Sequence, residues 1–449
     1  MSIADFSGRL RPDACPGALQ VHEAADGPMA RVRLPGGAIS PGRLRELAAC
    51  AADLGSGVIE LTSRANVQVR GLRSPAAFAE RIAAAGLLPS AAHERVRNIV
   101  ASPLGGRTGL LDPQPLVEAL DRALCGRARL AGLPGRFLFA VDDGGGDMLA
   151  LGADVTFYDG RLLLAGVDAG LAVGADAAAD RMVAAAEAFL DERETSGADG
   201  GAWRIAELRN GPARIATRLH ATDTPARRDT RLDTTGTSAH APDASAPDAS
   251  ARAADVRPAS HPQAGSAVGA EGRAVPAAGM RDPSTAAAPR AGRVGQRDGR
   301  VALEVVVPLG RLSAAQARAI AAAAIATAAE MDGPEDTAGV PVRFTPWRTV
   351  VLLDLQPAAA DQVARVLAAA GLVTDPASPW AGVSACTGRP GCAKSLADVQ
   401  EDARRWVATL DGPPATPVHW AGCERRCGLP RGRVVQLVAT GDGYQERQQ

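Results

Sequence analysis

Short apolar runs alternate with segments of helical periodicity in the first part of the chain. The run at Ala30–Leu34 is typical of a strand, and Ser40 followed by Pro41 is typical of a helix start, with an N-cap and a first-turn proline. Apolar residues then recur three and four positions apart until Gly55 ends the helix. The pattern predicts a strand, a helix, two strands and a helix at 30–34, 41–54, 58–61, 67–69 and 75–85.

The same order of elements recurs later in the chain. The pattern there predicts strand 303–307, helix 313–331, strands 342–344 and 350–353, and a helix from about 358. The second helix of each copy ends in Ala-Ala-Gly-Leu, at 84–87 and 369–372. Strand, helix, strand, strand, helix is most of a ferredoxin-like unit. The matching ends favour gene duplication, with a pseudo-twofold arrangement, over a chance recurrence.

A segment of different composition separates the two copies. From 221 to 300, Leu232 is the only Leu, Ile, Phe, Tyr or Trp, so this segment cannot bury enough apolar surface to offset its ordering entropy. We therefore expect a disordered linker, in which His240 and His261 are poor ligand candidates. The expected class is α+β, with ferredoxin-like half-domains at 1–89 and 299–374, an α/β domain after each at 90–220 and 375–449, and the linker at 221–298.

Charge and hydropathy narrow the function classes. The net charge is −1 and the pI about 6.6, so no basic field would hold nucleic acid or an anionic membrane. No uncharged apolar run reaches the roughly 18 residues of a membrane span, and the first residues do not resemble a secretory signal. We expect a cytoplasmic protein whose seven cysteines are not a disulfide framework.

Four of the cysteines gather near the C-terminus. Five residues separate Cys386 from Cys392 and three separate Cys423 from Cys427, with several glycines beside them. Four thiolates are the ligand set of a [4Fe–4S] cluster. Zinc is the chemical alternative, but paired cysteines of structural zinc sites prefer two to four intervening residues. Four unrelated thiols are the remaining alternative.

This cysteine spacing, after a duplicated ferredoxin-like unit, resembles the nitrite/sulfite reductase family. The resemblance covers nearly the whole chain except the linker. It implies that each half-domain is followed by a nitrite/sulfite reductase-type domain and that the second of these holds a [4Fe–4S] cluster on Cys386, Cys392, Cys423 and Cys427. In the family the last cysteine also bridges to sirohaem iron, a role that would fall to Cys427.

The family also has a basic cavity, and several polar residues here look like its parts. Residues 61–70 resemble its Thr-x-Arg segment and following strand, and an extended 64–70 would place alternate side chains on one face. Guanidinium groups bind carboxylates bidentately, as a tetrapyrrole requires. A solvated strand face or surface ion pairs are the alternatives. The candidate substrate-binding residues are Arg64, Asn66, Gln68, Arg70, Arg97 and Arg136.

One departure from the reductase pattern changes the expected reaction. Leu138 stands where the family usually has the second lysine of a Lys-Phe-Lys element, and a cation there would hold a bound oxyanion. Segments 342–348 and 385–395 resemble a branch of the family in which the tetrapyrrole is the substrate. The resemblance implies a monooxygenase-type oxidoreductase that hydroxylates this substrate with O2 and forms a lactone in aerobic cobalamin biosynthesis.

The same resemblance implies an unidentified electron donor, and a non-haem iron is the candidate for a second metal centre beside the cluster. A sirohaem-dependent sulfite or nitrite reductase is the alternative enzyme. A non-catalytic iron–sulfur or tetrapyrrole-binding protein is the alternative from another class. No residue can be assigned a catalytic role from the sequence.

An acidic, glycine-rich run follows the apolar stretch 137–141. Asp142, Asp143 and Asp147 flank three glycines, and such carboxylates could hold a hard cation or a non-haem iron. A run of this kind is more often a turn between two strands. We expect the turn.

Overall fold

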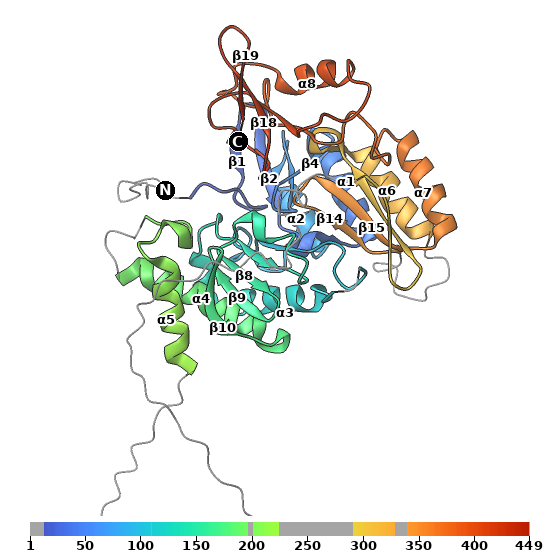
Figure 1. Cartoon of the computed structure of the whole chain (residues 1–449). Coiled ribbons are helices and arrows are strands. Elements are labelled where there is room, and N and C mark those ends of the chain that lie inside the picture. The colour runs from blue at the N-terminus through green and yellow to red at the C-terminus, as the bar shows by residue number, and fades with distance from the viewer. Residues whose placement is uncertain (1–12, 109, 196–200, 224–290, 328–338, 449) are drawn as a thin grey trace, which may run out of the picture.

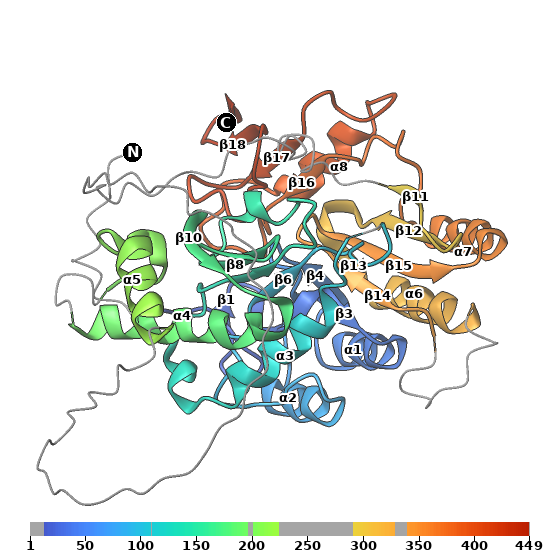
Figure 2. The ribbon, with the colours of Figure 1, turned by 60° about the horizontal axis from the view of Figure 1, so that its bottom comes forward.

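The computed structural model describes residues 13–108, 110–195, 201–223, 291–327 and 339–448. The described strands form three five-stranded sheets and one four-stranded sheet. In Figures 1 and 2, helices α1, α6 and α7 lie together on one flank, and the C-terminal region with α8 lies at one end of the molecule. None of the helices in the described ranges is long and apolar enough to cross a membrane.

The first half-domain has the predicted order of elements. Ser40 accepts a hydrogen bond from the Arg43 amide and Pro41 takes the first helical position, so helix α1 begins where the sequence predicted. Buried leucines on one stripe of α1 face the sheet. Its elements are β2 Gly27–Val32, α1 Pro41–Leu54, β4 Val58–Leu61, β5 Val67–Val69 and α2 Pro75–Ala84, preceded by β1 His22–Ala24.

The second half-domain repeats this order. Ser313 and Gln316 form a capping box at the start of its first helix. That helix ends at Ala326, and the rest of the predicted 313–331 helix lies outside the described residues. The duplication that the sequence predicted is confirmed in its elements, which are β12 Val301–Val306, α6 Ala314–Ala326, β14 Val342–Phe344, β15 Thr349–Leu355 and α7 Pro357–Ala369.

Each half-domain contributes one strand to the sheet of the other. Strand β3 (Ala38–Ile39), from the first half, pairs with β14 of the second, and strand β13 (Arg311–Ser313) pairs with β4 of the first. The sheet orders are β1-β2-β5-β4-β13 and β11-β12-β15-β14-β3. The pairing of β13 with β4 is reinforced by an ion pair of 2.5 Å between Arg311 and Glu60, which lie opposite each other in the register. The sequence did not predict this exchange.

A tight turn leads into each exchanged strand. Pro35-Gly36-Gly37 and Pro308-Leu309-Gly310 are one-turn 3-10 helices at equivalent places in the two repeats. Gly37 has φ +69°, and a Cβ there would lie 1.9 Å from the carbonyl oxygen of Phe344. Glycine is therefore required where the first repeat crosses closest to the second.

The two half-domains also share one hydrophobic core. Helices α1 and α6 pack against each other, and fully buried side chains from both repeats join one cluster, among them Leu44, Leu47, Leu312 and Ile320. Because strands and core are shared, the two half-domains form one folding unit.

The other two domains repeat each other as well. In each, three parallel strands are followed by an antiparallel one, and a helix lies between the first two strands. The first has β6 Ile99–Ala101, α3 Gln114–Cys125, β7 Phe139–Val141, β8 Val155–Tyr158, β9 Arg161–Leu164, β10 Val167–Ala172, α4 Ala175–Thr195 and α5 Gly211–Asp223. The second has β16 Val383–Ala385, α8 Val399–Val407, β17 Val418–Ala421, β18 Val435–Ala439 and β19 Tyr444–Gln448.

Both ends of the predicted linker 221–298 need correction. Helix α5 continues to Asp223, and strand β11 (Gly292–Gly295) pairs with β12, so the second half-domain begins before residue 299. Backbone pairing with an apolar neighbour orders β11, although its own composition predicts no strand. The rest of the predicted linker lies outside the described residues.

The strand exchange predicts that two fragments, 1–250 and 251–449, will depend on each other. Separately, each would lack one strand and part of the shared core, so we expect the amides of β4 and β14 to exchange rapidly with solvent. Mixed or co-expressed fragments should form a one-to-one complex in which those amides are protected. Hydrogen exchange read by mass spectrometry would decide, and slow exchange of β4 in the lone N-terminal fragment would contradict the prediction.

Candidate cofactor and ligand site

The four C-terminal cysteines lie on two loops of the last domain. Cys386 directly follows β16, Cys392 lies farther along the same loop, and Cys423 and Cys427 follow β17. None is in a disulfide. Burial raises the pKa of Cys386, and the thiols of Cys427 and Cys392 raise it further. Burial also raises the pKa of Cys427, together with Cys423 and Cys392. The fold therefore brings the predicted ligands into one electrostatic site.

The backbone approaches these thiols closely at two glycines. The Gly422 amide donates to Sγ of Cys386 at 3.2 Å. A Cβ at Gly422 would lie 1.9 Å from Oγ of Ser395, and Gly428 has φ +79°, so larger residues would strain both positions. Four free thiols, with a backbone donor at the sulfur of Cys386, are surroundings that suit an iron–sulfur cluster. These residues fit the predicted [4Fe–4S] cluster, whose presence stays a prediction.

Arg70 connects the first half-domain to the first cysteine loop. Its guanidinium donates to both carboxylate oxygens of Asp26, at 2.7 and 2.8 Å, and to the carbonyl oxygen of Gly391 at 2.6 Å. Gly391 directly precedes Cys392. The contact that the structure gives Arg70 therefore positions a predicted cluster ligand.

His419 lies in strand β17, which leads into the second cysteine loop. It is fully buried, and its Nδ1 is 2.9 Å from Oγ of Ser384. Burial and the charge of Arg348 lower its pKa to about 3. The ring is therefore neutral at physiological pH, so it can serve as a hydrogen-bonding group but not as a cation for an anionic ligand.

A cavity of about 490 Å³ lies beside the second cysteine loop, within the size range of small-molecule sites. Both half-domains and both of the other domains contribute to its wall. Leu429 and Pro430, which follow Cys427 closely in sequence, are part of it. The charged residues in the wall are Arg64, Arg204, Arg348, Arg431, Arg433 and Asp147.

Protein contacts hold three of the five arginines in place. Arg64 donates to the carbonyl oxygens of Gly135 and Arg136, at 3.1 and 2.9 Å, and burial lowers its pKa to about 10. Arg348 donates to the carbonyl oxygen of Gly428 at 2.5 Å, and Arg204 forms an ion pair with Asp154. Burial also lowers the pKa of Arg348 to about 10, so Arg64 and Arg348 both remain cationic at neutral pH.

The other two arginines are available to a ligand. Burial and the nearby Arg204 lower the pKa of Arg431, which shows that two cations face each other here. Within the described ranges, neither Arg431 nor Arg433 has a recorded carboxylate partner. A group of uncompensated guanidinium groups around a cavity is suited to a ligand with several carboxylates.

Apolar residues complete the wall. Leu138 and Trp347 both line the cavity, and they pack together in a small cluster with Ala65 and Val100. An indole beside cations suits a ligand that has a flat apolar body and an anionic periphery.

Of the six predicted substrate-binding residues, Arg64 alone lines this cavity. Asn66 is buried against Asn98, Gln68 donates to Glu60, and Arg97 forms a bidentate pair with Asp121. The Arg136 guanidinium lies 4.9 Å from the centre of the Trp203 ring. In the structure these four residues contact other side chains of the protein, and ligand binding by them stays a prediction.

The expected strand 64–70 is shorter than predicted. Strand β5 spans only Val67–Val69, and Arg64 lies in the turn before it, where Ala65 has φ +55°. The side-chain oxygen of Thr62 stabilises this turn, because it accepts hydrogen bonds from the backbone amides of Arg64 and Asn66. The turn, and not strand alternation, directs Arg64 into the cavity.

Sequence reasoning missed the other four arginines of the cavity. Arg348 lies in the Thr-Pro-Trp-Arg segment that aligns with Arg64 in the repeat, and Arg431 and Arg433 closely follow Cys427. Their positions beside a repeated motif and a predicted cluster ligand could have identified these three arginines as candidates from the sequence. Arg204 gave no such signal, since only the tertiary fold brings it to the cavity.

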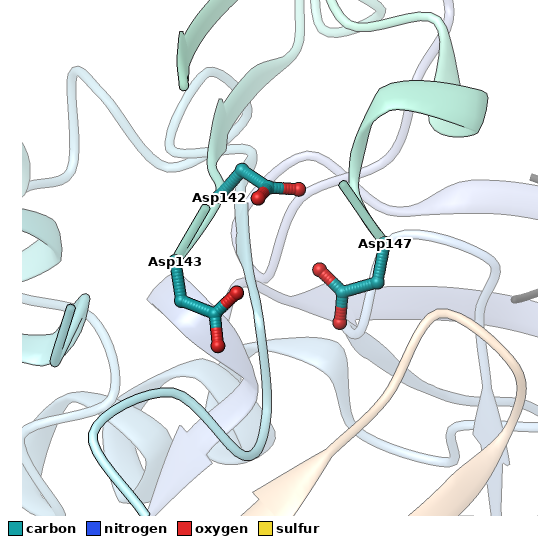
Figure 3. A group of neighbouring side chains, drawn as sticks. All are labelled: Asp142, Asp143 and Asp147. Carbon is teal, nitrogen blue, oxygen red and sulfur yellow. The ribbon is translucent and has the colours of Figure 1, made fainter. Parts of the chain in front are cut away.

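The acidic run forms the predicted turn, between β7 and β8. Asp142 accepts hydrogen bonds from three backbone amides, those of Gly144, Gly146 and Met148. Ligand atoms of Asp142, Asp143 and Asp147 lie within 4.8 Å of one another, and Figure 3 shows the three carboxylates converging. Because the carboxylate of Asp142 already accepts hydrogen bonds from the backbone of its own loop, these contacts support the turn over a cation site.

The acidic turn and the second cysteine loop are equivalent in the duplicated domains. Asp143 and Asp147 follow β7 at the same spacing as Cys423 and Cys427 follow β17. Ser102 follows β6 as Cys386 follows β16. Two copies of one loop therefore carry thiols in one domain and carboxylates in the other.

One protein family and several known proteins are similar to this chain. The family described as nitrite/sulfite reductase ferredoxin-like half domain matches residues 21–77 and 294–370. A precorrin-3B synthase from Sinorhizobium sp is 26% identical over 441 residues, which cover 97% of this chain and 82% of that protein. A ferredoxin–nitrite reductase from Synechococcus elongatus is 34% identical over 126 residues, 26% of this chain and 25% of the reductase.

Among solved structures, the Mycobacterium tuberculosis NirA protein matches with a TM-score of 0.63 and 21% identity, over 94% of this chain and 73% of that one. At this identity the likeness shows the shared fold. Both half-domains match the same family, and the sequence similarity extends over nearly the whole chain. The chain therefore contains two half-domains of the nitrite/sulfite reductase type, and it shares the fold of the NirA protein over nearly its whole length.

Proposed function

We propose that this protein is an oxidoreductase that catalyses the precorrin-3B synthase reaction on a polycarboxylate tetrapyrrole. The observation that carries the proposal is the cavity beside the cysteine loops, with five arginines, Leu138 and Trp347 in its wall. The similarity to a precorrin-3B synthase over nearly the full chain supports it. A cytoplasmic location belongs to the same proposal.

Leu138 favours this reaction over reduction of sulfite or nitrite. It lines the cavity and is only 3% exposed. A reductase needs cations close to the bound oxyanion, because they stabilise its charge as oxygen leaves. An apolar side chain at that place suits a ligand whose ring system is packed by apolar groups and whose carboxylates reach the arginines.

In the proposed reaction one atom of O2 adds across a double bond of the tetrapyrrole and the other becomes water, with two electrons and two protons consumed. A carboxyl group of the substrate then adds through its oxygen to one of the two carbons as the new carbon–oxygen bond there breaks, which closes the lactone. The released oxygen takes the carboxyl proton and stays on the neighbouring carbon as the hydroxyl. Arg64, Arg348 and Arg431 would bind the side-chain carboxylates, and Trp347 and Leu138 would pack on the ring. These contacts would orient one ring carbon for reaction, a proximity effect.

The four cysteines are proposed to hold a [4Fe–4S] cluster, which supplies single electrons when bound. An electron donor and a possible non-haem iron remain part of the proposal, with no residue assigned to either. Sirohaem would be the cofactor under the alternative hypothesis, a sulfite or nitrite reductase. Acid–acetone extraction distinguishes the proposed reaction from this alternative, because sirohaem would be extractable from a reductase.

Replacement of cluster ligands provides the first test. Cys386→Ser and Cys427→Ser should each lose most iron and acid-labile sulfide and the broad visible absorption of anaerobically purified protein. Cys125→Ser is the matched control, since Cys125 ends helix α3 in another domain. Full iron and sulfide in both ligand variants would contradict the assignment.

The cavity is tested by ligand affinity. Uroporphyrin, whose side chains all end in carboxylates, is the probe, and Arg64→Ala should weaken its binding about 10- to 100-fold, as expected from ~1.5–3 kcal/mol for a hydrogen bond to a charged group. Arg45→Ala, on the exposed side of α1, should leave affinity unchanged. Equal affinity of wild type and Arg64→Ala, by fluorescence quenching, would place the ligand elsewhere.

Turnover tests the reaction itself. Anaerobically purified protein is supplied with precorrin-3A, a chemical reductant and isotopically heavy O2. We expect a product that contains one heavy oxygen atom, detected by mass spectrometry. Product with no oxygen from O2, or reduction of sulfite at a higher rate, would exclude the proposed reaction.

A further inference from the structure

Asp147 is an acidic residue in a wall of arginines. It is the only carboxylate among the described residues that line the cavity, together with Arg64, Arg204, Arg348, Arg431 and Arg433. No ion pair with any of these arginines is recorded within the described part of the chain. Asp147 accepts a hydrogen bond from Oγ of Ser102 at 2.5 Å, and its carboxyl group also hydrogen-bonds with that of Asp142. Asp147 is therefore placed at the ligand surface without a cationic partner of its own.

The neighbours of Asp147 favour its neutral form. The carboxylates of Asp142 and Asp143 lie within 4.8 Å of it, and they converge on it in Figure 3. Burial, followed by the charge of Asp142, raises the pKa of Asp147 to about 7, although the hydrogen bond from Ser102 works in the opposite direction. Three backbone amides stabilise the charge of Asp142, so a proton shared by the group belongs on Asp147.

We propose that Asp147 takes up a proton when an anionic tetrapyrrole occupies the cavity, and then presents a protonated carboxyl group to the ligand. This inference rests on the ligand class of the proposed function. It adds a hydrogen-bond donor to a wall that otherwise binds through fixed cations. It also makes binding depend on pH in a range where no arginine titrates.

The electrostatics of binding determine the sign of this dependence. A bound ligand removes water from Asp147 and brings carboxylates to the same wall, and both changes disfavour ionised Asp147. The facing groups are Asp142 and Asp143 on its own loop, Ser102 at the end of β6, and the arginines across the cavity. Carboxylates of a bound ligand neutralise part of the positive field that these arginines produce at Asp147.

The pKa of Asp147 is therefore higher in the complex than in the free protein. Binding should take up a proton above about pH 7, where free Asp147 is mostly ionised. Affinity should fall as the pH rises through this range, by at most about tenfold per pH unit for one proton. The dependence should flatten above the pKa of the complex.

The test is calorimetric titration of full-length protein with uroporphyrin at pH 8, in buffers of different ionisation enthalpy, after treatment with a chelator. The observed enthalpy should vary with the buffer and give an uptake approaching one proton per ligand. Asp147→Asn keeps the size and the acceptor for Ser102 but cannot titrate, so the uptake should disappear. Asp180→Asn, at an exposed ion pair on α4, should retain it.

A second variant guards against misfolding of Asp147→Asn. Ser102→Ala removes the hydrogen bond that lowers the pKa of Asp147, so it should move the fall in affinity to higher pH while Asp147 is kept. Unchanged proton uptake in a folded Asp147→Asn variant, or an unmoved pH profile in Ser102→Ala, would overturn the inference. So would tight binding of Mn²⁺ that Asp147→Asn abolishes, because the carboxylates would then hold a cation.

The outcomes also separate this inference from the proposed function. If uroporphyrin binds and Arg64→Ala weakens it, the ligand class stands, and the proton count alone decides the role of Asp147. If wild-type protein does not bind uroporphyrin at any pH, the ligand class fails and the inference fails with it.

Discussion

Strands β3 and β13 each complete the sheet of the opposite half-domain, and the rest of the molecule depends on this exchange. The backbone N–H and C=O groups at the edge of a sheet need hydrogen-bond partners. Here the edge strands β4 and β14 find those partners in a strand of the other repeat. The turn at Gly37 approaches the carbonyl oxygen of Phe344 so closely that no side chain fits. One core then spans both repeats, with α1 packed on α6.

The exchange brings two copies of one turn to the same cavity. Thr62 accepts the amides two and four residues later, and Thr345 does the same in the second repeat. Both turns have a residue at positive φ, Ala65 and Arg348. The copies have diverged in side chain, because the first presents Arg64 and the second presents Trp347 and Arg348. Duplication supplied the backbone, and divergence supplied an anion-binding side and an apolar side.

The flanking domains diverged in the same manner. Their equivalent loops after β7 and β17 carry carboxylates in one copy and thiols in the other. Thiolates at close range suit iron and sulfide, whereas carboxylates at close range share protons unless a cation separates them. Both loops lie along the wall of one cavity, through Asp147 on one side and Leu429 on the other. The proposed cluster and the proposed proton-binding carboxyl group would thus face one ligand.

The sequence by itself determined the local elements and the resemblance to the nitrite/sulfite reductases. Helical periodicity, the caps at Ser40 and Ser313, and the cysteine spacing depend on residues close in the chain, so they could be read without a fold. The strand exchange, the cavity wall and the placement of Arg204 and Asp147 could not, because they join residues that are distant in sequence. Arg97 illustrates the difference: its motif indicated a ligand contact, but the packing of α3 placed Asp121 against it. Only tertiary structure decides which arginine keeps a protein partner and which is left for a ligand, since that depends on the nearest carboxylate in space.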